Sequence, residues 1–174
     1  MSSDFNFERV VLEGGELPLV ILLTDAEPTR LEERARELCD DRWPNWSRSY
    51  SGVIALVAGW HQRVGVDVEF LHRASDTSWS IDDMSFRSAM MTPEEREHLP
   101  MLDDDPGASA VNLWCSKEAL AKALGTTRGM DPARLTGAAM WDHLRRGAWR
   151  ATFLDLLTLE YDAIGWLVYE SRWP

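Results

Sequence analysis

Two lysines lie close together in a chain that otherwise uses arginine for positive charge. Lys117 and Lys122 are the only lysines among its 18 lysine and arginine residues. An ammonium group is a compact point charge on a flexible stem, so it suits a phosphate oxygen or a crowded polar site better than a forked guanidinium does. The pair therefore indicates such a site, and the alternative is chance in a stretch of good helix formers.

Two carboxylates alternate with valines in the segment Val66-Asp67-Val68-Glu69. Side chains two residues apart on a strand share a face, which places these carboxylates about 7 Å apart. At an effective dielectric near 20, their repulsion costs roughly 2.4 kcal/mol if nothing lies between them. Water on an open face would solvate the pair. A hard cation such as Mg²⁺ is the other solution, because it binds carboxylate oxygens and keeps water or phosphate as further ligands.

The segment around the lysines has the spacing of a helix. Steps of four place Trp114, Glu118 and Lys122 on one stripe, and Lys117 falls on a neighbouring apolar stripe. A lysine on an apolar stripe must extend its charge to the surface or meet a buried anion. Glu118 and Lys122 are also spaced as an exposed ion pair worth about 0.2–0.5 kcal/mol, so the helix alone leaves that alternative open.

The elements that would position these residues follow an α+β pattern. Thr92-Pro93-Glu94-Glu95 is typical of a helix start, with a threonine cap, a proline at the first position and a glutamate three residues after the cap. Gly125 is placed as a helix stop. The patterns predict strands at 17–23, 51–60 and 64–69, a closing hairpin at 153–159 and 163–169, and helices ending near 38, 91 and 124.

These elements divide into two halves, 1–72 and 73–174, which we expect to form one compact unit with the active site between them. The 174 residues are 45% hydrophobic and include nine tryptophans, which is enough for a buried core. A formal net charge of −11 argues against nucleic acid or an anionic membrane as the main partner.

Cysteine usage and the N-terminus bear on location. Cys39 and Cys115 form neither a metal-ligand spacing nor a disulfide framework, as in a reducing compartment. The first residues lack a basic and then apolar signal region, and the longest apolar run, Leu17 to Leu23, is too short to span a bilayer. We therefore expect a cytoplasmic protein.

Taken together, the two motifs resemble those of the 4′-phosphopantetheinyl transferases, which activate acyl and peptidyl carrier proteins. That family pairs a Gly-x-Asp-x-Glu strand with a later Trp-x-x-Lys-Glu-Ala-x-x-Lys helix, which here are Gly65 to Glu69 and Trp114 to Lys122. The stretch Met91 to Leu99 is similar to the family's intervening helix. The resemblance runs from about 45 to 129 and more loosely to the C-terminal hairpin. It is to the two-half, surfactin-synthetase-activating type, with a shortened N-terminal part.

The resemblance implies a fold of two similar αβ halves related by pseudo-twofold symmetry. It implies Mg²⁺-dependent transfer of phosphopantetheine from coenzyme A to a carrier-protein serine, with release of 3′,5′-ADP. Such transfer makes holo carrier proteins for fatty acid, polyketide or nonribosomal peptide synthesis. Glu118, directly or through a metal-bound water, is the implied base for the serine proton, and Lys122 would offset charge on the leaving group. The implied metal ligands are Asp67, Glu69 and Glu118, and the implied coenzyme A ligands are Arg48, Ser49, Tyr50, Lys117 and Lys122.

Two departures from the family pattern support an alternative within the same fold, whereas the retained acidic residues and lysines of the two motifs oppose it. The family commonly has Ser-His-Ser-Gly before the acidic strand, whereas this chain has Ser49-Tyr50-Ser51-Gly52. Tyrosine keeps a hydrogen-bond donor but loses the cation that histidine offers a phosphate. The part before this motif is also short and mostly acidic. One alternative is therefore a degenerate homologue that binds coenzyme A or a carrier protein without transfer. The other is an acidic interaction module whose motifs are coincidental.

A docking surface for the carrier protein is a further expectation. Apolar residues after the acidic strand would form a dock for a carrier helix, with core packing as an equal or better alternative. The exposed pair Arg145-Arg146, together with Arg150, is a candidate basic patch for an acidic carrier. We expect a monomer, with a dimer as the alternative. The docking residues are Trp79, Ile81, Met84 and Phe86.

Overall fold

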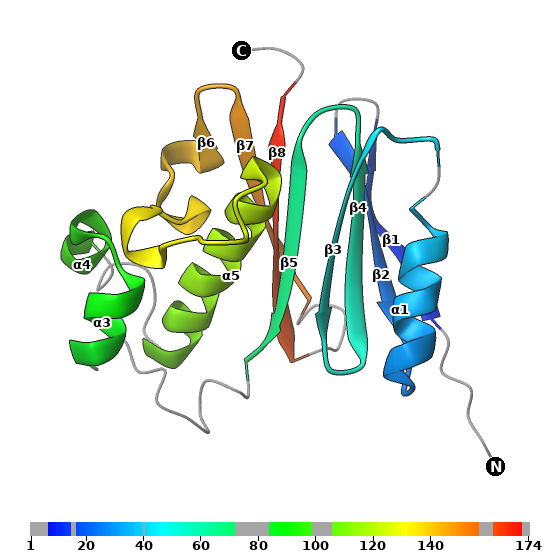
Figure 1. The fold of residues 1–174 in the computed structure, drawn as a ribbon, viewed down its shortest axis with the longest axis horizontal. Coiled ribbons are helices and arrows are strands. Elements are labelled where there is room, and N and C mark those ends of the chain that lie inside the picture. The colour runs from blue at the N-terminus through cyan, green and yellow to red at the C-terminus, as the bar shows by residue number, and fades with distance from the viewer. Residues whose placement is uncertain are drawn as a thin grey trace.

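The computed structural model describes residues 7–14, 17–39, 41–71, 84–98, 106–156 and 162–171. Within these ranges the chain forms two antiparallel sheets of four strands each, which stand side by side (Figure 1). The expected α+β class is confirmed. The first sheet has the order β1-β2-β4-β3 and contains β1 (Phe7–Gly14), β2 (Leu17–Thr24), β3 (Asn45–Ser51) and β4 (Ile54–Trp60). The second has the order β5-β8-β7-β6 and contains β5 (Val64–Phe70), β6 (Arg145–Arg146), β7 (Trp149–Asp155) and β8 (Ala163–Glu170).

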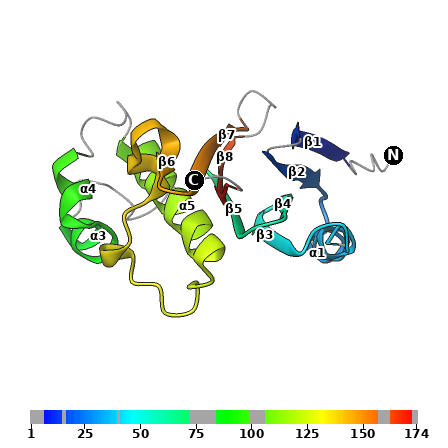
Figure 2. The same cartoon turned by 90° about the horizontal axis from the view of Figure 1, so that it is seen from above.

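Helices cover the outer faces of the two sheets. The helix α1 (Pro28–Glu37) packs on β2 and β4, and the long helix α5 (Pro106–Leu124) packs on β5 and β8 (Figure 2). Two shorter helices, α3 (Met84–Met90) and α4 (Pro93–His98), lie beyond α5. Single 3₁₀ turns at Pro132–Arg134, Ala138–Met140 and Asp142–Leu144 lead from α5 to β6. No helix in the described ranges is both long enough and apolar enough to cross a membrane.

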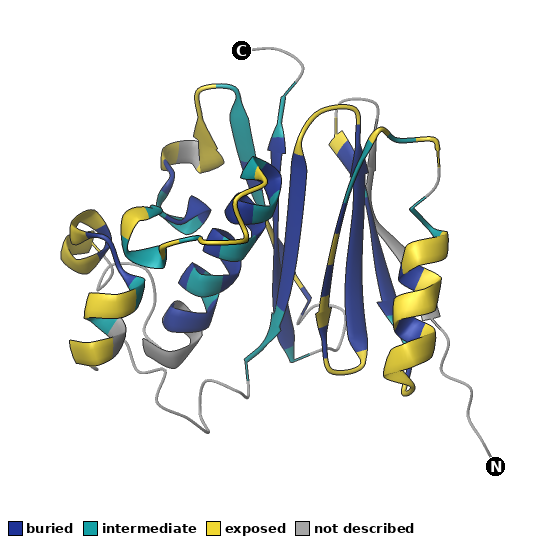
Figure 3. Ribbon diagram, viewed as in Figure 1, coloured by how far each residue is buried: buried dark blue, intermediate teal, exposed yellow. Residues whose placement is uncertain are grey.

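The alternation of side chains along the central strands divides the interior into layers. In β2, Val20 and Leu22 lie in the core between the sheets, whereas Ile21 and Leu23 face α1. Figure 3 shows the resulting pattern, with buried central strands and an exposed outer side of α1. The fully apolar strand β4 is buried on both faces, as its continuous hydrophobic run indicates.

The strand predictions are confirmed in part. A single strand was expected at 51–60, but the structure has a hairpin in which β3 ends at Ser51 and β4 begins at Ile54. Gly52 has a φ of +57° in this turn, a conformation that glycine adopts without steric cost. The strands β1, β3 and β6 were not predicted, and β7 begins at Trp149, earlier than expected.

The boundary between the sheets falls at the turn between β4 and β5. All strands of the first sheet lie before residue 61, and β5 pairs with β8 in the second sheet. β5 therefore belongs structurally with the C-terminal strands, although its residues lie in the expected first half. The division at residue 72 and the pseudo-twofold relation stay predictions.

Candidate active site

Glycine at position 65 allows α5 to lie directly on β5. A Cβ atom there would meet the backbone of Ala119 and Ala123 well inside the 3.0 Å that real Cβ contacts keep. The helix and strand therefore approach at their backbones, which only glycine permits. Because Glu118 and Lys122 each precede one of these alanines, the crossing brings their side chains to β5. This close approach explains why glycine precedes the two carboxylates in β5.

Asp67 lies at the centre of the site and is only 3% exposed. Its Oδ1 atom accepts hydrogen bonds from Ser49 Oγ at 2.6 Å and from Lys122 Nζ at 2.7 Å. The same ammonium also donates to the Val66 carbonyl at 3.2 Å. Within the described part of the chain, the buried Asp67 Oδ2 accepts no hydrogen bond. The structure thus brings together Asp67, Ser49 and Lys122, which the sequence assigned to one site.

Three serines at alternate positions of β3 face β5 across the junction between the sheets. Besides the Ser49 bond to Asp67, Ser47 Oγ accepts the Val66 N–H at 2.9 Å, and Ser51 Oγ donates to Glu69 Oε2 at 3.4 Å. β3 and β5 are edge strands of different sheets and are not paired with each other. The serine side chains therefore connect these two edges in place of backbone hydrogen bonds between strands. Sequence analysis identified Ser49 but missed the row, although the period-two spacing of the serines was visible.

The carboxylate of Glu118 shares the electrostatic environment of Asp67. Burial raises the pKa of Glu118, the negative charge of Asp67 raises it further, and Lys122 opposes the rise. Cys115 is fully buried nearby, and burial followed by the charges of Asp67 and Glu69 raises the pKa of its thiol well above the usual value. A thiol held protonated in this way is not a nucleophile. The site therefore offers carboxylates and an ammonium group.

The donor set of the site fits a hard cation. Asp67 Oδ2 is a buried carboxylate oxygen with no partner in the described ranges, and such an atom is rare in a folded protein unless an ion or water satisfies it. Glu69 and Glu118 add carboxylates, which are the oxygen ligands that Mg²⁺ prefers. The side chains are not gathered tightly, since no group of three or more His, Cys, Asp or Glu residues in the described part of the chain is arranged to hold a metal ion.

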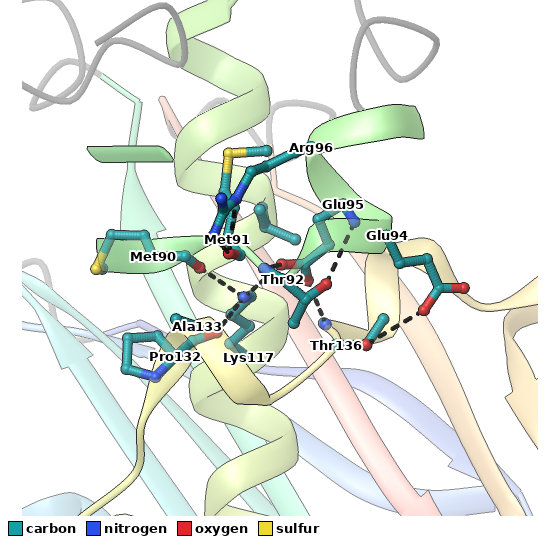
Figure 4. Close-up of polar contacts among 12 residues, drawn as sticks. Met90, Met91, Thr92, Glu94, Glu95, Arg96, Lys117, Pro132, Ala133 and Thr136 are labelled. Atoms are coloured by element: carbon teal, nitrogen blue, oxygen red, sulfur yellow. Dashed lines mark hydrogen bonds and ion pairs between the residues drawn. The ribbon is translucent and has the colours of Figure 1, made fainter. Parts of the chain in front are cut away.

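Lys117, which the sequence analysis expected among the coenzyme A ligands, lies in a buried ion pair. Its side chain is 1% exposed, and the ammonium donates to Glu95 Oε2 at 2.6 Å, to the Met90 carbonyl at 2.6 Å and to the Pro132 carbonyl at 2.5 Å (Figure 4). An ammonium has three protons, so these bonds use all of them. Lys117, on the apolar stripe of α5, thus meets a buried anion, as one of the two expected outcomes for such a lysine. Lys117 and Lys122 therefore have different carboxylate partners.

Glu95 is the anion that Lys117 meets, and it is completely buried. Its carboxylate also accepts the N–H groups of Thr92 at 2.7 Å and Gly137 at 2.7 Å, while Thr92 Oγ1 accepts the Glu95 N–H at 3.2 Å. The predicted helix cap at Thr92 is therefore confirmed as a capping box. Burial lowers the pKa of Lys117, against the opposing effect of Glu95. This cluster fastens α3, α4 and the segment 132–137 to α5.

Arg48 and Tyr50 lie on the other face of β3 from the serines. In the strand register they oppose Val57 and Ala55, whose side chains pack towards α1. Both side chains are exposed, and partial burial still raises the pKa of Tyr50 while the neighbouring Arg48 lowers it. The structure therefore does not bring these two expected coenzyme A ligands to Asp67.

The expected docking residues are described only in part. Trp79, Ile81 and the side chain of Phe86 lie outside the described residues. Met84, at the start of α3, is 77% exposed, and a single exposed apolar side chain is common on protein surfaces. The docking surface stays a prediction.

Comparison with known proteins gives one family. A family model described as "4'-phosphopantetheinyl transferase superfamily" matches residues 63–161, more than half of the chain. The match spans β5 and α5, and so contains Asp67, Glu118 and Lys122. A search of curated proteins gives no match for this chain.

Proposed function

Because this chain belongs to the 4′-phosphopantetheinyl transferase superfamily, we propose that it transfers 4′-phosphopantetheine from coenzyme A to a carrier protein. The acceptor is a serine hydroxyl of an acyl or peptidyl carrier protein, which attacks the β-phosphorus of coenzyme A, and 3′,5′-ADP leaves. The observation that carries the proposal is the contact of Lys122 with the buried Asp67, at 2.7 Å, beside Glu118. An ammonium group beside carboxylates can contact a phosphate oxygen, while the carboxylates can hold a divalent cation that neutralises the diphosphate.

Glu118 is the proposed base for the serine proton. Burial raises the pKa of its carboxyl, and a carboxylate with a raised pKa is a stronger proton acceptor. The enzyme needs no nucleophile of its own, which agrees with the protonated state of the buried Cys115 thiol. The charge of Asp67 acts on Glu118, so we assign the same side chain to the proposed metal site as well.

Asp67, Glu69 and Glu118 are the residues that would hold Mg²⁺. The ion, when bound, supplies positive charge to the diphosphate and to the leaving group. Lys122 contributes a second positive charge, and its side chain is 21% exposed, so a phosphate oxygen can reach it from solvent. Ser49 holds the Asp67 carboxylate in place. Hydrogen-bonded support of this kind orients carboxylate ligands in metal sites generally.

The remaining coenzyme A ligands are proposed from the sequence. Arg48 and Tyr50 are exposed on the α1 side of β3 and stay predictions for the nucleotide end of coenzyme A. The buried ion pair of Lys117 supports a structural role for that residue in place of the expected phosphate contact. The two-half type, the monomeric state, the cytoplasmic location and the pathway served stay predictions from the sequence.

A second candidate function is binding of coenzyme A or a carrier protein without transfer. The observation that favours it is Tyr50, which stands where the family commonly has histidine and faces away from the carboxylates. This candidate shares the fold and the acidic site but predicts no change in the mass of the carrier protein.

Mass spectrometry of an apo carrier protein separates the two candidates. The carrier is incubated with this protein, coenzyme A and Mg²⁺, and transfer adds the mass of one phosphopantetheine group. Glu118→Gln should abolish the gain, while Glu33→Gln, which removes an exposed carboxylate on α1, should preserve it. Coenzyme A binding without any mass gain on several carriers would favour the second candidate.

A further inference from the structure

In this structure the cation that neutralises Asp67 is a side chain of the protein itself. Lys122 Nζ lies 2.7 Å from Asp67 Oδ1, and the Asp67 side chain is only 5% exposed. The ammonium also donates to the Val66 carbonyl at 3.2 Å, so two acceptors on neighbouring residues of β5 hold it. This geometry fixes a positive charge at the carboxylate around which the proposed metal site would form.

The position of the ammonium conflicts with a divalent cation at the same carboxylate. A monovalent charge beside Asp67 repels an incoming Mg²⁺ at close range, where the interior screens charges much less than water does. It also removes part of the negative charge that would attract the ion. The Lys122 side chain is 21% exposed and the Asp67 side chain 5%, so the lysine covers part of the carboxylate from solvent.

The conflict disappears if the ammonium has another anion to contact. A diphosphate at the mouth of the site offers phosphate oxygens to Lys122, whose long flexible stem allows its charge to move. Asp67 would then keep the Ser49 hydroxyl on Oδ1, at 2.6 Å, and present both oxygens to the metal ion. Mg²⁺ and the diphosphate would each favour binding of the other, because both draw on the same movement of one side chain.

We propose that Lys122 is an internal competitor for the cation site of this protein. In the free protein it neutralises Asp67 and keeps the affinity for Mg²⁺ low, and a substrate diphosphate relieves the competition. The proposal rests on the proposed function, in which these carboxylates hold Mg²⁺. It assigns to Lys122 a role in the free protein besides its contact with a phosphate in the complex.

Calorimetric titration of the full chain with Mg²⁺ alone tests the proposal. Lys122→Met and Lys122→Gln both remove the competing charge, and the glutamine amide can still donate to Asp67. We expect both variants to bind Mg²⁺ about tenfold or more tightly than the unmodified protein, since one close charge is worth at least that factor. Arg134→Met is the matched control. It changes the net charge by the same amount, but it removes the positive charge from an exposed ion pair with Asp131.

A thermal melting curve is measured for each variant to show that it is folded. If Lys122→Met does not fold, the Mg²⁺ affinity of Lys122→Gln tests the proposal instead. A second titration with coenzyme A present should tighten Mg²⁺ binding to the unmodified protein much more than to the Lys122 variants. Equal or weaker Mg²⁺ affinity in the folded Lys122 variants overturns the proposal. Absence of Mg²⁺ binding in every variant also overturns it, and the carrier-protein mass assay then decides separately whether the proposed transfer stands.

Discussion

Replacement of Lys117 by methionine separates the structural role of this residue from the expected phosphate contact. The ammonium is buried with Glu95 at 2.6 Å, and it also donates to the carbonyls of Met90 and Pro132. Methionine has a similar length and fills the same space but carries no charge and no donor. The change would therefore leave a fully buried carboxylate and two carbonyls without their shared partner.

The cost follows from the burial of the pair. Removal of one member of a buried ion pair destabilises a protein by about 3–5 kcal/mol, because the remaining charge is left uncompensated in the interior. Glu95 would keep the N–H groups of Thr92 and Gly137, which favours the lower end of this range. For a chain of this size each 1 kcal/mol lowers Tm by about 2–4 °C, so a fall of about 6–12 °C is expected for 3 kcal/mol.

Urea denaturation measures the free energy of unfolding of Lys117→Met against Arg134→Met. Arg134 forms an ion pair with Asp131 on the surface, where its side chain is 87% exposed, so the control should change stability by less than about 0.5 kcal/mol. Coenzyme A affinity is then measured below the melting temperature of both variants. A stability loss under about 1 kcal/mol together with a collapse of coenzyme A affinity would refute the structural role.

Three further changes test the packing and electrostatics of the site. Gly65→Ala should destabilise by about 1–3 kcal/mol and reduce transfer, because the new Cβ collides with the Ala119 backbone and moves α5 away from β5. Glu118→Gln should raise the free energy of unfolding at pH 7, because burial and Asp67 hold the folded pKa above the unfolded one and the ionised form therefore costs stability. That gain should vanish as the pH falls through the unfolded value of 4.5, below which the carboxyl is protonated in both states. Ser47→Ala should cost about 1–3 kcal/mol, because a buried N–H of β5 loses its acceptor.

Each of these changes has a control and an outcome that contradicts it. Gly147→Ala is the control for Gly65→Ala, because no atom lies within 4 Å of the added Cβ and only the φ of +59° disfavours the alanine. Equal transfer activity of the two variants would show that α5 and β5 tolerate the Cβ at position 65. A stability difference for Glu118→Gln that persists at pH 4 would contradict the raised pKa. Ser51→Ala removes a longer bond of 3.4 Å, so a loss as large as that of Ser47→Ala would mean that the N–H contact is unimportant.

Local patterns in the sequence were sufficient for several elements of this fold. The alternation of valines and carboxylates gave β5, and threonine, proline and glutamate at 92–95 gave the start of α4. Gly125, with a φ of +69°, follows the end of α5 as expected of a helix stop. These features depend on backbone geometry within a few residues, so the residue types alone report them.

The strands at the junction were harder to predict. β3 carries Ser47, Ser49 and Ser51 in place of the apolar residues that mark a buried strand, so its sequence resembles a loop. The serine hydroxyls on its inward face instead form hydrogen bonds with residues of β5 that lie 18 or 19 positions further along the chain. No local pattern contains that pairing.

The sequence by itself determined which side chains could do chemistry here: two motifs placed Asp67, Glu69, Glu118 and Lys122 on a strand and a helix whose residue types indicate a cation and a phosphate. Only the tertiary structure decided how the two lysines divide their roles. Lys117 forms a buried ion pair with Glu95, whereas Lys122, on the same helix, contacts Asp67 and stays partly accessible to solvent. The physical reason is that a charge next to an apolar stripe takes whichever anion the fold brings to it, and both anions arrive from elements distant in sequence.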